Sequence, residues 1–186
     1  MNILDFCRSL ISSLTRNPIP QGIRNEVDLE RKFVIPAAWN IVRPNCGIRI
    51  SSHPWNNKRQ CAPDCQSAPI SGKVEKGCPR CWAESKKWAS VATFGTHHDF
   101  DLVARDSKGK TLAVEVKFIG AKGGRKPNSE IQRLPGQCSL AKTKHDAVIG
   151  LCGYRGSPDP RWERDTQTVR GWFKRRDIFL IFRAVG

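Results

Sequence analysis

Acidic residues are scarce in this chain of 186 residues: 17 Asp and Glu stand against 32 Lys and Arg, which gives a net charge of +15 at pH 7. This excess of positive charge favours a polyanionic partner such as nucleic acid. The sequence also lacks an apolar run of about 18 residues, so we expect no membrane span. No basic residue precedes the apolar part of residues 1–15, which is not the pattern of a secretory signal peptide.

Without an export signal, the eight cysteines are expected in a reducing compartment, where thiols bind metals or fill cores more often than they form disulfides. We therefore expect an intracellular, cytoplasmic protein. The apolar fraction of 39%, with six Trp and eight Phe, is enough for a hydrophobic core and excludes disorder throughout. The length fits a single domain over residues 1–186 with room for a small insertion.

Apolar residues at helical spacing predict two helices in the N-terminal part of the chain. The first covers 3–14 and can be capped by Asn2. The second should begin at Asn25, a good N-cap, run through the apolar Val27, and stop at Pro36.

Residues 43–92 have a different composition from the rest of the chain. Prolines, glycines and five of the eight cysteines leave little periodicity over 43–81, and a short helix is expected over 82–92. A segment so poor in apolar residues cannot hold itself together by burial. We therefore interpret 43–92 as a cysteine-rich insertion within the domain.

The clearest local signal is a β-hairpin formed by residues 100–105 and 111–118, which a short turn sequence connects. Because side chains alternate between faces, Glu115 and Lys117 share one face of the second strand, and Asp101 stands at the start of the first strand. The opposite face of the second strand is apolar: Leu112, Val114, Val116 and Phe118.

Helices and strands alternate after the hairpin. We expect a helix from about Ser129 or Pro135 to Lys144, a buried strand over 147–152, a helix from Pro160 and a last strand over 178–182. The apolar stripe of the last helix should consist of Trp162, Thr166, Val169 and Phe173. Together the pattern predicts an α/β fold with one central sheet covered by helices.

The hairpin brings two carboxylates and an ammonium group to one point of the sheet: Asp101, Glu115 and Lys117. Hard divalent cations such as Mg²⁺ prefer oxygen ligands, and a pair of carboxylates with a backbone carbonyl supplies them. On these residues, in HDFDLVARDSKGKTLAVEVK, the sequence resembles the PD-(D/E)xK nuclease superfamily. The resemblance implies a restriction-endonuclease-like core, an α/β fold with a mixed central sheet flanked by helices. The stretches NEVDLERKFVIPAAW and RLPGQCSLAKTKHDAVIGL support the resemblance.

The resemblance implies a metal-dependent endonuclease that hydrolyses phosphodiester bonds in DNA with a metal-activated water. Asp101, Glu115 and the Val116 carbonyl would bind Mg²⁺ or Mn²⁺, and Lys117 would orient the attacking water. Two further helix residues would contribute to the site: Glu26 and Gln137. Asp99 is an alternative to Asp101 as a ligand, and Glu30 is an alternative to Glu26.

The insertion carries two cysteine pairs at the spacing of a structural Zn²⁺ site: Cys61, Cys65, Cys78 and Cys81. Zinc would fold a segment that burial cannot fold. An iron–sulfur cluster is the alternative, and Cys46 and His53 are reserve ligands. The remaining cysteines, Cys7, Cys138 and Cys152, are expected to be core thiols.

Basic residues after the hairpin could contact a phosphate backbone: Lys122, Arg125, Lys126, Lys142 and Lys144. Two alternatives remain open at this point, a non-catalytic nucleic-acid-binding zinc protein on a nuclease-like scaffold and a nuclease that acts on RNA. His97 and His98 also leave open a ββα-metal nuclease. Because the recognition surface is small, sequence specificity would need a homodimer or an auxiliary protein.

Overall fold

The centre of the computed structural model is a mixed sheet of five strands in the order β1-β4-β5-β6-β7. The strands are β1 (Ile48–Ser52), β4 (Leu102–Asp106), β5 (Thr111–Ile119), β6 (Ala147–Tyr154) and β7 (Ile178–Ala184). The pairs β1–β4 and β4–β5 are antiparallel, and β5–β6 and β6–β7 are parallel. The structure describes residues 1–42, 46–52, 90–93, 96–120, 127–155 and 160–186.

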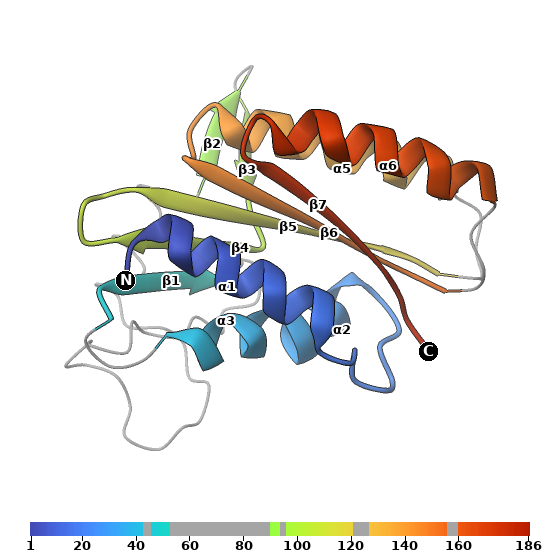
Figure 1. Ribbon diagram of the computed structural model, residues 1–186, viewed down its shortest axis with the longest axis horizontal. Coiled ribbons are helices and arrows are strands. Elements are labelled where there is room, and N and C mark those ends of the chain that lie inside the picture. The colour runs from blue at the N-terminus through green and yellow to red at the C-terminus, as the bar shows by residue number, and fades with distance from the viewer. Residues whose placement is uncertain (43–45, 53–89, 94–95, 121–126, 156–159) are drawn as a thin grey trace.

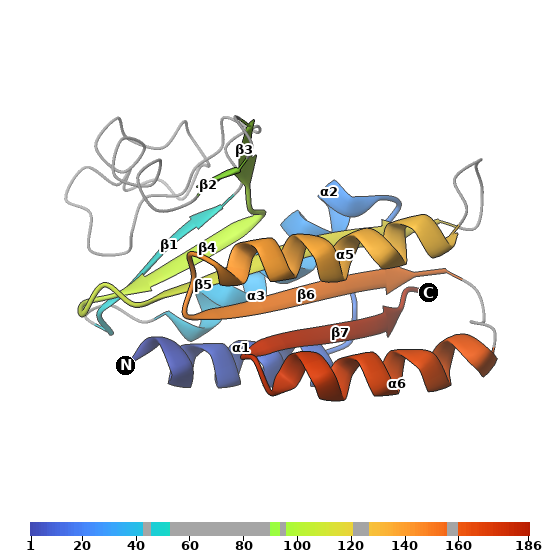
Figure 2. The ribbon, with the colours of Figure 1, turned by 90° about the horizontal axis from the view of Figure 1, so that it is seen from above.

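Helices cover both faces of this sheet (Figures 1 and 2). One face carries α1 (Ile3–Arg16), α2 (Glu26–Leu29) and α3 (Ile35–Ile41), and the other carries α5 (Pro127–Lys142) and α6 (Pro160–Lys174). Both α5 and α6 connect parallel strands, so each runs back across the sheet against the direction of its strands. The predicted α/β fold with a mixed, helix-flanked sheet is confirmed. Among the described helices, none has the length and apolarity needed to cross a membrane.

Side chains of β5 alternate between two hydrophobic cores, as the hairpin pattern predicted. Leu112, Val114 and Val116 pack with the core under α1, α2 and α3. Ala113 packs on the opposite face with Leu134 and Cys138 of α5. Glu115 and Lys117 continue this second face, so the sheet itself directs them toward the α5 layer.

Local signals placed the helix starts correctly. The Asn2 side chain accepts a hydrogen bond from the backbone N–H of Asp5, and the Asn25 side chain accepts one from the N–H of Asp28. Such caps satisfy amides that have no partner within the helix. The three cysteines expected in the core, Cys7, Cys138 and Cys152, are buried.

The predicted end of the second helix at Pro36 is wrong. The helix continues to Ile41 through a π-helical turn, Glu30–Val34, in which the N–H of Ile35 donates to the carbonyl of Glu30. Pro36 stands in α3 directly after this turn, so the proline does not end the helix here. Val27, expected on the apolar side of this helix, is 42% exposed.

Residues 43–92 include strands that composition did not reveal. Ile48–Ser52 forms edge strand β1 of the central sheet, with Ile48 and Ile50 buried. The helix expected over 82–92 is wrong at its end, because β2 (Ser90–Thr93) pairs there with β3 (Thr96–Asp99). Residues 43–45 and 53–89 lie outside the described part of the chain.

The helix after Pro160 matches its predicted buried face in part. Thr166 and Phe173 are buried, whereas Val169, expected in the same stripe, is 37% exposed. The side chain of Trp162 lies outside the described residues.

Two glycines of β6 let helices approach the sheet closely from opposite sides. A Cβ on Gly150 would lie 2.7 Å from Cys138 Sγ of α5, and a Cβ on Gly153 would lie 2.7 Å from a methyl group of Leu29 in α2. Gly150 pairs with Glu115 in the neighbouring strand. The two glycines therefore set how near α2 and α5 come to the end of β5 that carries Glu115 and Lys117.

Candidate functional site

Asp101 and Glu115 lie beside each other on the paired strands β4 and β5. Leu102 is opposite Val114, so the antiparallel register places Asp101, one residue earlier, next to Glu115. The N–H of Val116 donates to Asp101 Oδ2 over 2.6 Å, which fixes the carboxylate against β5. Both acids are buried, Asp101 at 7% and Glu115 at 2% exposure. Carboxylates are rarely buried to this extent without partners.

Lys117 brings a cation to the same place. Its Nζ lies 2.9 Å from Glu115 Oε1 and 3.0 Å from the Val116 carbonyl oxygen. It also lies 3.3 Å from Glu26 Oε1 of α2. Although burial alone would lower the pKa of Lys117, the negative charges of Glu115 and Glu26 raise it above its usual value. Lys117 is therefore a protonated ammonium group at neutral pH.

Asp101 lies where negative charge is in excess. Burial raises its pKa well above the ordinary value, and the charges of Glu115 and Glu30 raise it further. The hydrogen bond from the Val116 amide and the charge of Lys117 act in the opposite direction but are weaker. A buried acid whose pKa is raised by burial and by other acids is typical of functional sites.

Helix α2 and the π-helical turn that follows it contribute two acidic residues with different surroundings. Glu30, at the start of the π-helical turn, is only 4% exposed and is close enough to raise the pKa of Asp101. The Glu26 side chain is 42% exposed and pairs with Lys117. Glu30 therefore does not lie on a solvated helix face.

Sequence spacing could have identified Glu30 as buried. Glu30 lies three and four residues before Phe33 and Val34, which are both in the core. This is the spacing of neighbours on one helical face. A charged residue that interrupts the apolar face of a helix is therefore the sequence signal for a buried charge.

Gln137 lies on α5, next to the residue that packs toward Glu115. Its neighbour Cys138 is fully buried, and burial, followed by the charge of Glu115, raises the pKa of that thiol. The side-chain oxygen of Gln137 is buried without a hydrogen-bond partner among the described residues. Such a group is an acceptor available to a bound ligand or water.

Lys142 and Lys144 do not join this site. α5 runs back across the sheet, so both lie near Thr111, about 20 Å along β5 from Lys117 at 3.3 Å per residue. Lys142 donates to the Asp146 carbonyl and lies 3.8 Å from an Asp177 carboxylate oxygen. Burial lowers the pKa of Lys144. The sequence placed these lysines after the hairpin but could not show at which end of the sheet they lie.

Several predicted residues fall outside the described part of the chain. These are the zinc ligands with their reserve ligand His53 and the basic residues of the loop after β5: Cys61, Cys65, Cys78, Cys81, Lys122, Arg125 and Lys126. The alternative ligand Asp99, with His97 and His98, belongs to β3, but the side chains of this strand are not described. These assignments therefore stay predictions.

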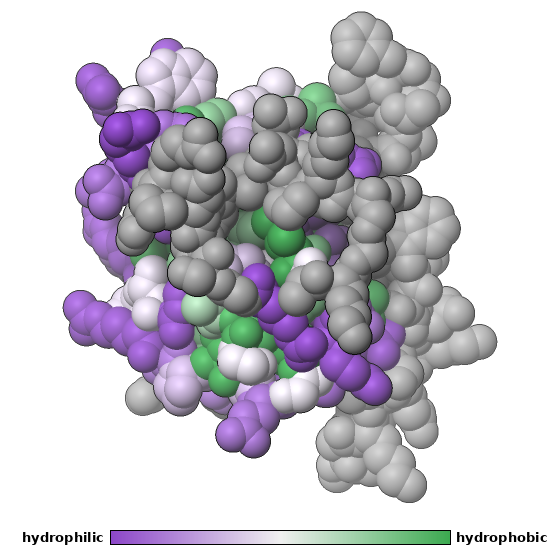
Figure 3. Space-filling model, turned by 90° about the vertical axis from the view of Figure 1, so that its right-hand side faces the viewer, coloured by the Kyte–Doolittle hydropathy of each residue, from purple (hydrophilic) through white to green (hydrophobic). Residues whose placement is uncertain are grey.

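Figure 3 looks toward the end of the sheet at which β5, β6 and β7 finish, where apolar residues lie among hydrophilic ones. Within the described residues, no group of three or more His, Cys, Asp or Glu side chains is gathered as metal ligands would be. The oxygen donors at this place are two carboxylates, of Asp101 and Glu115, and the carbonyl of Val116. Comparison of the chain with protein-family models, curated proteins and solved structures gave no match.

Proposed function

We propose that this protein is a Mg²⁺- or Mn²⁺-dependent endonuclease that hydrolyses phosphodiester bonds in DNA. The observation that carries the proposal is the buried group of Asp101, Glu115 and Lys117 on paired strands of a chain with a net charge of +15. Its positive charge suits a polyanionic substrate, and its carboxylates suit a hard cation. The mixed, helix-flanked sheet agrees with the architecture that the resemblance to PD-(D/E)xK nucleases implies.

The donor set fits a divalent metal ion. Asp101 and Glu115 repel each other in a buried place, as the raised pKa of Asp101 indicates, and a divalent cation would relieve this repulsion. The carbonyl of Val116 adds a third oxygen close to Glu115, since both groups contact the same Lys117 ammonium. When bound, the metal would lower the pKa of a water ligand and polarise a phosphoryl oxygen.

The chain's own residues have the following roles in this proposal. Asp101 and Glu115 hold the cation, and Lys117 orients the attacking water and interacts with the scissile phosphate. Glu30 is better placed than Glu26 to support the ligands, because it is buried and its charge acts on Asp101. Gln137 of α5 offers a buried side-chain amide oxygen.

The substrate contacts follow from chain order and charge. Lys122, Arg125 and Lys126 come directly after β5, within ten residues of Lys117 in the sequence. We propose that they hold the DNA backbone near the metal site. Zn²⁺ bound by Cys61, Cys65, Cys78 and Cys81 would stabilise the insertion.

Cleavage assays with purified protein test the proposal. Supercoiled plasmid, labelled single-stranded DNA and labelled RNA are incubated with Mg²⁺ or Mn²⁺ and with the variants Asp101→Asn, Glu115→Gln and Lys117→Met. We expect each variant to cut DNA about 100-fold more slowly or worse, the usual effect of removing a metal ligand or an electrostatic stabiliser. Asp146→Asn, which alters a carboxylate at the other end of the sheet, is the matched control and should keep activity.

Two outcomes would replace this proposal. Binding of DNA that weakens steeply with salt, without cleavage under any condition, indicates a non-catalytic binding protein. Cleavage of RNA alone indicates a ribonuclease that uses the same site. Activity that persists in all three variants would show that the chemistry resides elsewhere in the chain.

A further inference from the structure

The ammonium group of Lys117 is surrounded by acceptors. Its Nζ has contacts of 2.9 Å to Glu115 Oε1, 3.0 Å to the Val116 carbonyl and 3.3 Å to Glu26 Oε1. An ammonium group has three N–H donors, so these three acceptors match its full capacity. The side chain is 10% exposed, which leaves little of it to water.

Two of these acceptors are the oxygens that the proposed function assigns to the metal ion. A hard divalent ion bound to the same oxygens would lie about 2.0–2.6 Å from each. An ammonium nitrogen at 2.9 and 3.0 Å from both oxygens occupies the same side of them. Two cations cannot share this position, because their repulsion rises steeply at such separations in a buried place.

The third acceptor differs from the other two. Glu26 comes from α2 instead of β5, and its side chain is 42% exposed, against 3% for Glu115. An ammonium group that leaves Glu115 and the Val116 carbonyl can therefore stay paired with Glu26 while it moves toward solvent. The flexible four-carbon stem of lysine allows such a movement without a change in the backbone.

We propose that Lys117 is a stand-in cation, which occupies the metal position until a divalent ion displaces it, and that Glu26 is the positioning residue that receives it. This inference rests on the proposed function. In the metal-free protein, Lys117 neutralises the buried carboxylate of Glu115. Metal loading then moves the ammonium group to the more exposed side of the site, where a substrate phosphate would arrive.

Binding of Mn²⁺ to the full chain without nucleic acid, measured by titration calorimetry, tests the exchange. Four proteins are compared: the parent, Lys117→Met, Glu26→Gln and the double variant. We expect Lys117→Met to bind Mn²⁺ about tenfold more tightly, because the competing cation is gone. Glu26→Gln should weaken binding in the parent and leave it unchanged in the Lys117→Met background, since Glu26 acts through Lys117.

Asp28→Asn is the control for charge alone, because it removes the same charge from the same helix at a residue that pairs with Arg24 and Lys32. It should leave Mn²⁺ binding nearly unchanged in both backgrounds. If Glu26→Gln weakens binding equally with and without Lys117, Glu26 is a ligand or a general source of negative potential, and the inference is overturned. Equal Mn²⁺ affinity of the parent and Lys117→Met also overturns it.

A second measurement uses the unaltered protein, in case Lys117→Met does not fold. The Lys117 amine is acetylated by a short pulse of an N-hydroxysuccinimide ester, and the modification is quantified by mass spectrometry. Saturating Mn²⁺ should raise its labelling rate several-fold, whereas Lys108, which follows Asp106 at the far end of the sheet, should not change. Saturation with Mn²⁺ without faster labelling of Lys117 contradicts the exchange but leaves the nuclease proposal intact. If none of the four proteins binds Mn²⁺, both the exchange and the nuclease proposal are contradicted.

Discussion

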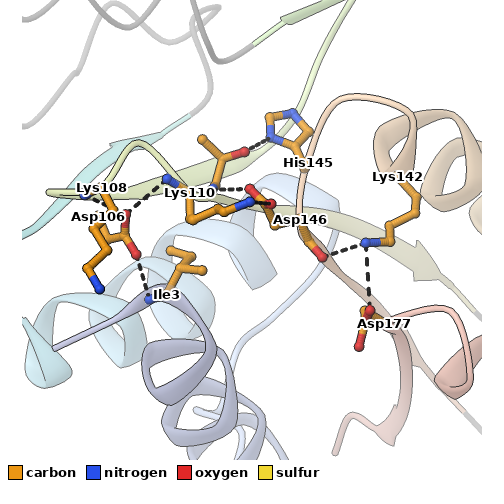
Figure 4. Close-up of polar contacts among 9 residues, drawn as sticks. Ile3, Asp106, Lys108, Lys110, Lys142, His145, Asp146 and Asp177 are labelled. Carbon is orange, nitrogen blue, oxygen red and sulfur yellow. Dashed lines mark hydrogen bonds and ion pairs between the residues drawn. The ribbon is translucent and has the colours of Figure 1, made fainter.

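The two ends of the central sheet both gather acidic residues from distant parts of the sequence, but they use them differently. At the end shown in Figure 4, carboxylate oxygens accept hydrogen bonds from N–H groups. Asp106 accepts backbone N–H groups from Ile3, Lys108 and Lys110. Asp146 accepts from the Lys110 ammonium and from the N–H of Thr111. This end is a structural network that joins α1, the hairpin turn and β6.

The other end concentrates negative charge. Asp101 accepts from the Val116 amide, and its other close charged neighbours include two acids, Glu115 and Glu30, which raise its pKa. The pKa values of Asp101 and Asp146 move in opposite directions. Although burial alone would raise the pKa of Asp146, hydrogen bonds from Lys110 and Thr111 lower it. Repulsion retained in a buried place lowers stability, so its persistence favours a functional interpretation of the Asp101 end.

Removal of the Asp106 carboxylate should have the largest effect on stability. Asp106→Ala removes the acceptor of three amide donors, one in a buried and two in part-buried hydrogen bonds, which we expect to lower the free energy of unfolding by about 3 kcal/mol. Urea denaturation followed by circular dichroism measures the change. Asp5→Ala removes an exposed acid on the same helix as Ile3, whose contacts with Asn2 and Arg8 are also exposed, and should change stability by less than about 1 kcal/mol. Equal effects of the two variants would contradict the structural role of this end.

A lower pH should reduce the stability of the protein through His145, which lies at the same end of the sheet as Asp106. This side chain is 2% exposed, with Nδ1 3.0 Å from Thr111 Oγ1 and no described partner for Nε2. Burial, followed by the charge of Lys144, lowers its pKa from 6.5 to about 4, against a smaller opposite effect of Asp146. The unfolded chain therefore takes up the proton first, and stability present above pH 6.5 is lost as the pH falls toward 4.

The loss should reach up to about 3 kcal/mol at pH 4, because a difference of one in pKa between the folded and unfolded states corresponds to about 1.4 kcal/mol. Urea denaturation of the parent and of His145→Gln between pH 7 and pH 4 measures it. The variant cannot titrate at this position, so the difference between the two proteins should change with pH in this window. A constant difference would show that His145 titrates normally in the folded protein.

Neutralisation of Asp101, at the other end of the sheet, should raise stability instead of lowering it, and by a smaller amount. Asp101→Asn keeps an acceptor for the Val116 amide and removes the repulsion from Glu115 and Glu30, so we expect it to raise stability by about 1 kcal/mol at pH 7. The same variant should lose cleavage. Loss of stability in Asp101→Asn would remove the contrast between the two ends.

The pH dependence of this gain also has a definite direction. The folded-state pKa of Asp101 is raised above 3.8, so its protonation stabilises the folded state, and this contribution is lost as the pH rises through the folded-state pKa. The advantage of Asp101→Asn over the parent should therefore shrink as the pH falls from 7 toward 4. Chemical denaturation at matched pH values measures this trend.

Local sequence signals determined much of the secondary structure. The caps Asn2 and Asn25, the hairpin and the buried strand β6 were predictable, because each depends on residues a few positions apart. Alternation along β5 also predicted that Glu115 and Lys117 share a face. Composition failed at β1, where proline and cysteine in the surrounding segment obscured the short alternation of Ile48 and Ile50.

Only the tertiary structure decided which charged residues meet. Helix spacing could indicate that Glu30 is buried but not that its charge acts on Asp101, and chain order alone placed Lys142 close to Lys117. The π-helical turn, the close approach of α2 and α5 at Gly153 and Gly150, and the return of α5 across the sheet settled these choices. The sequence by itself determined the chemistry available on each strand and helix, because that depends on local periodicity. The tertiary structure determined which groups share a buried environment, because burial and pKa depend on contacts between residues far apart in the chain.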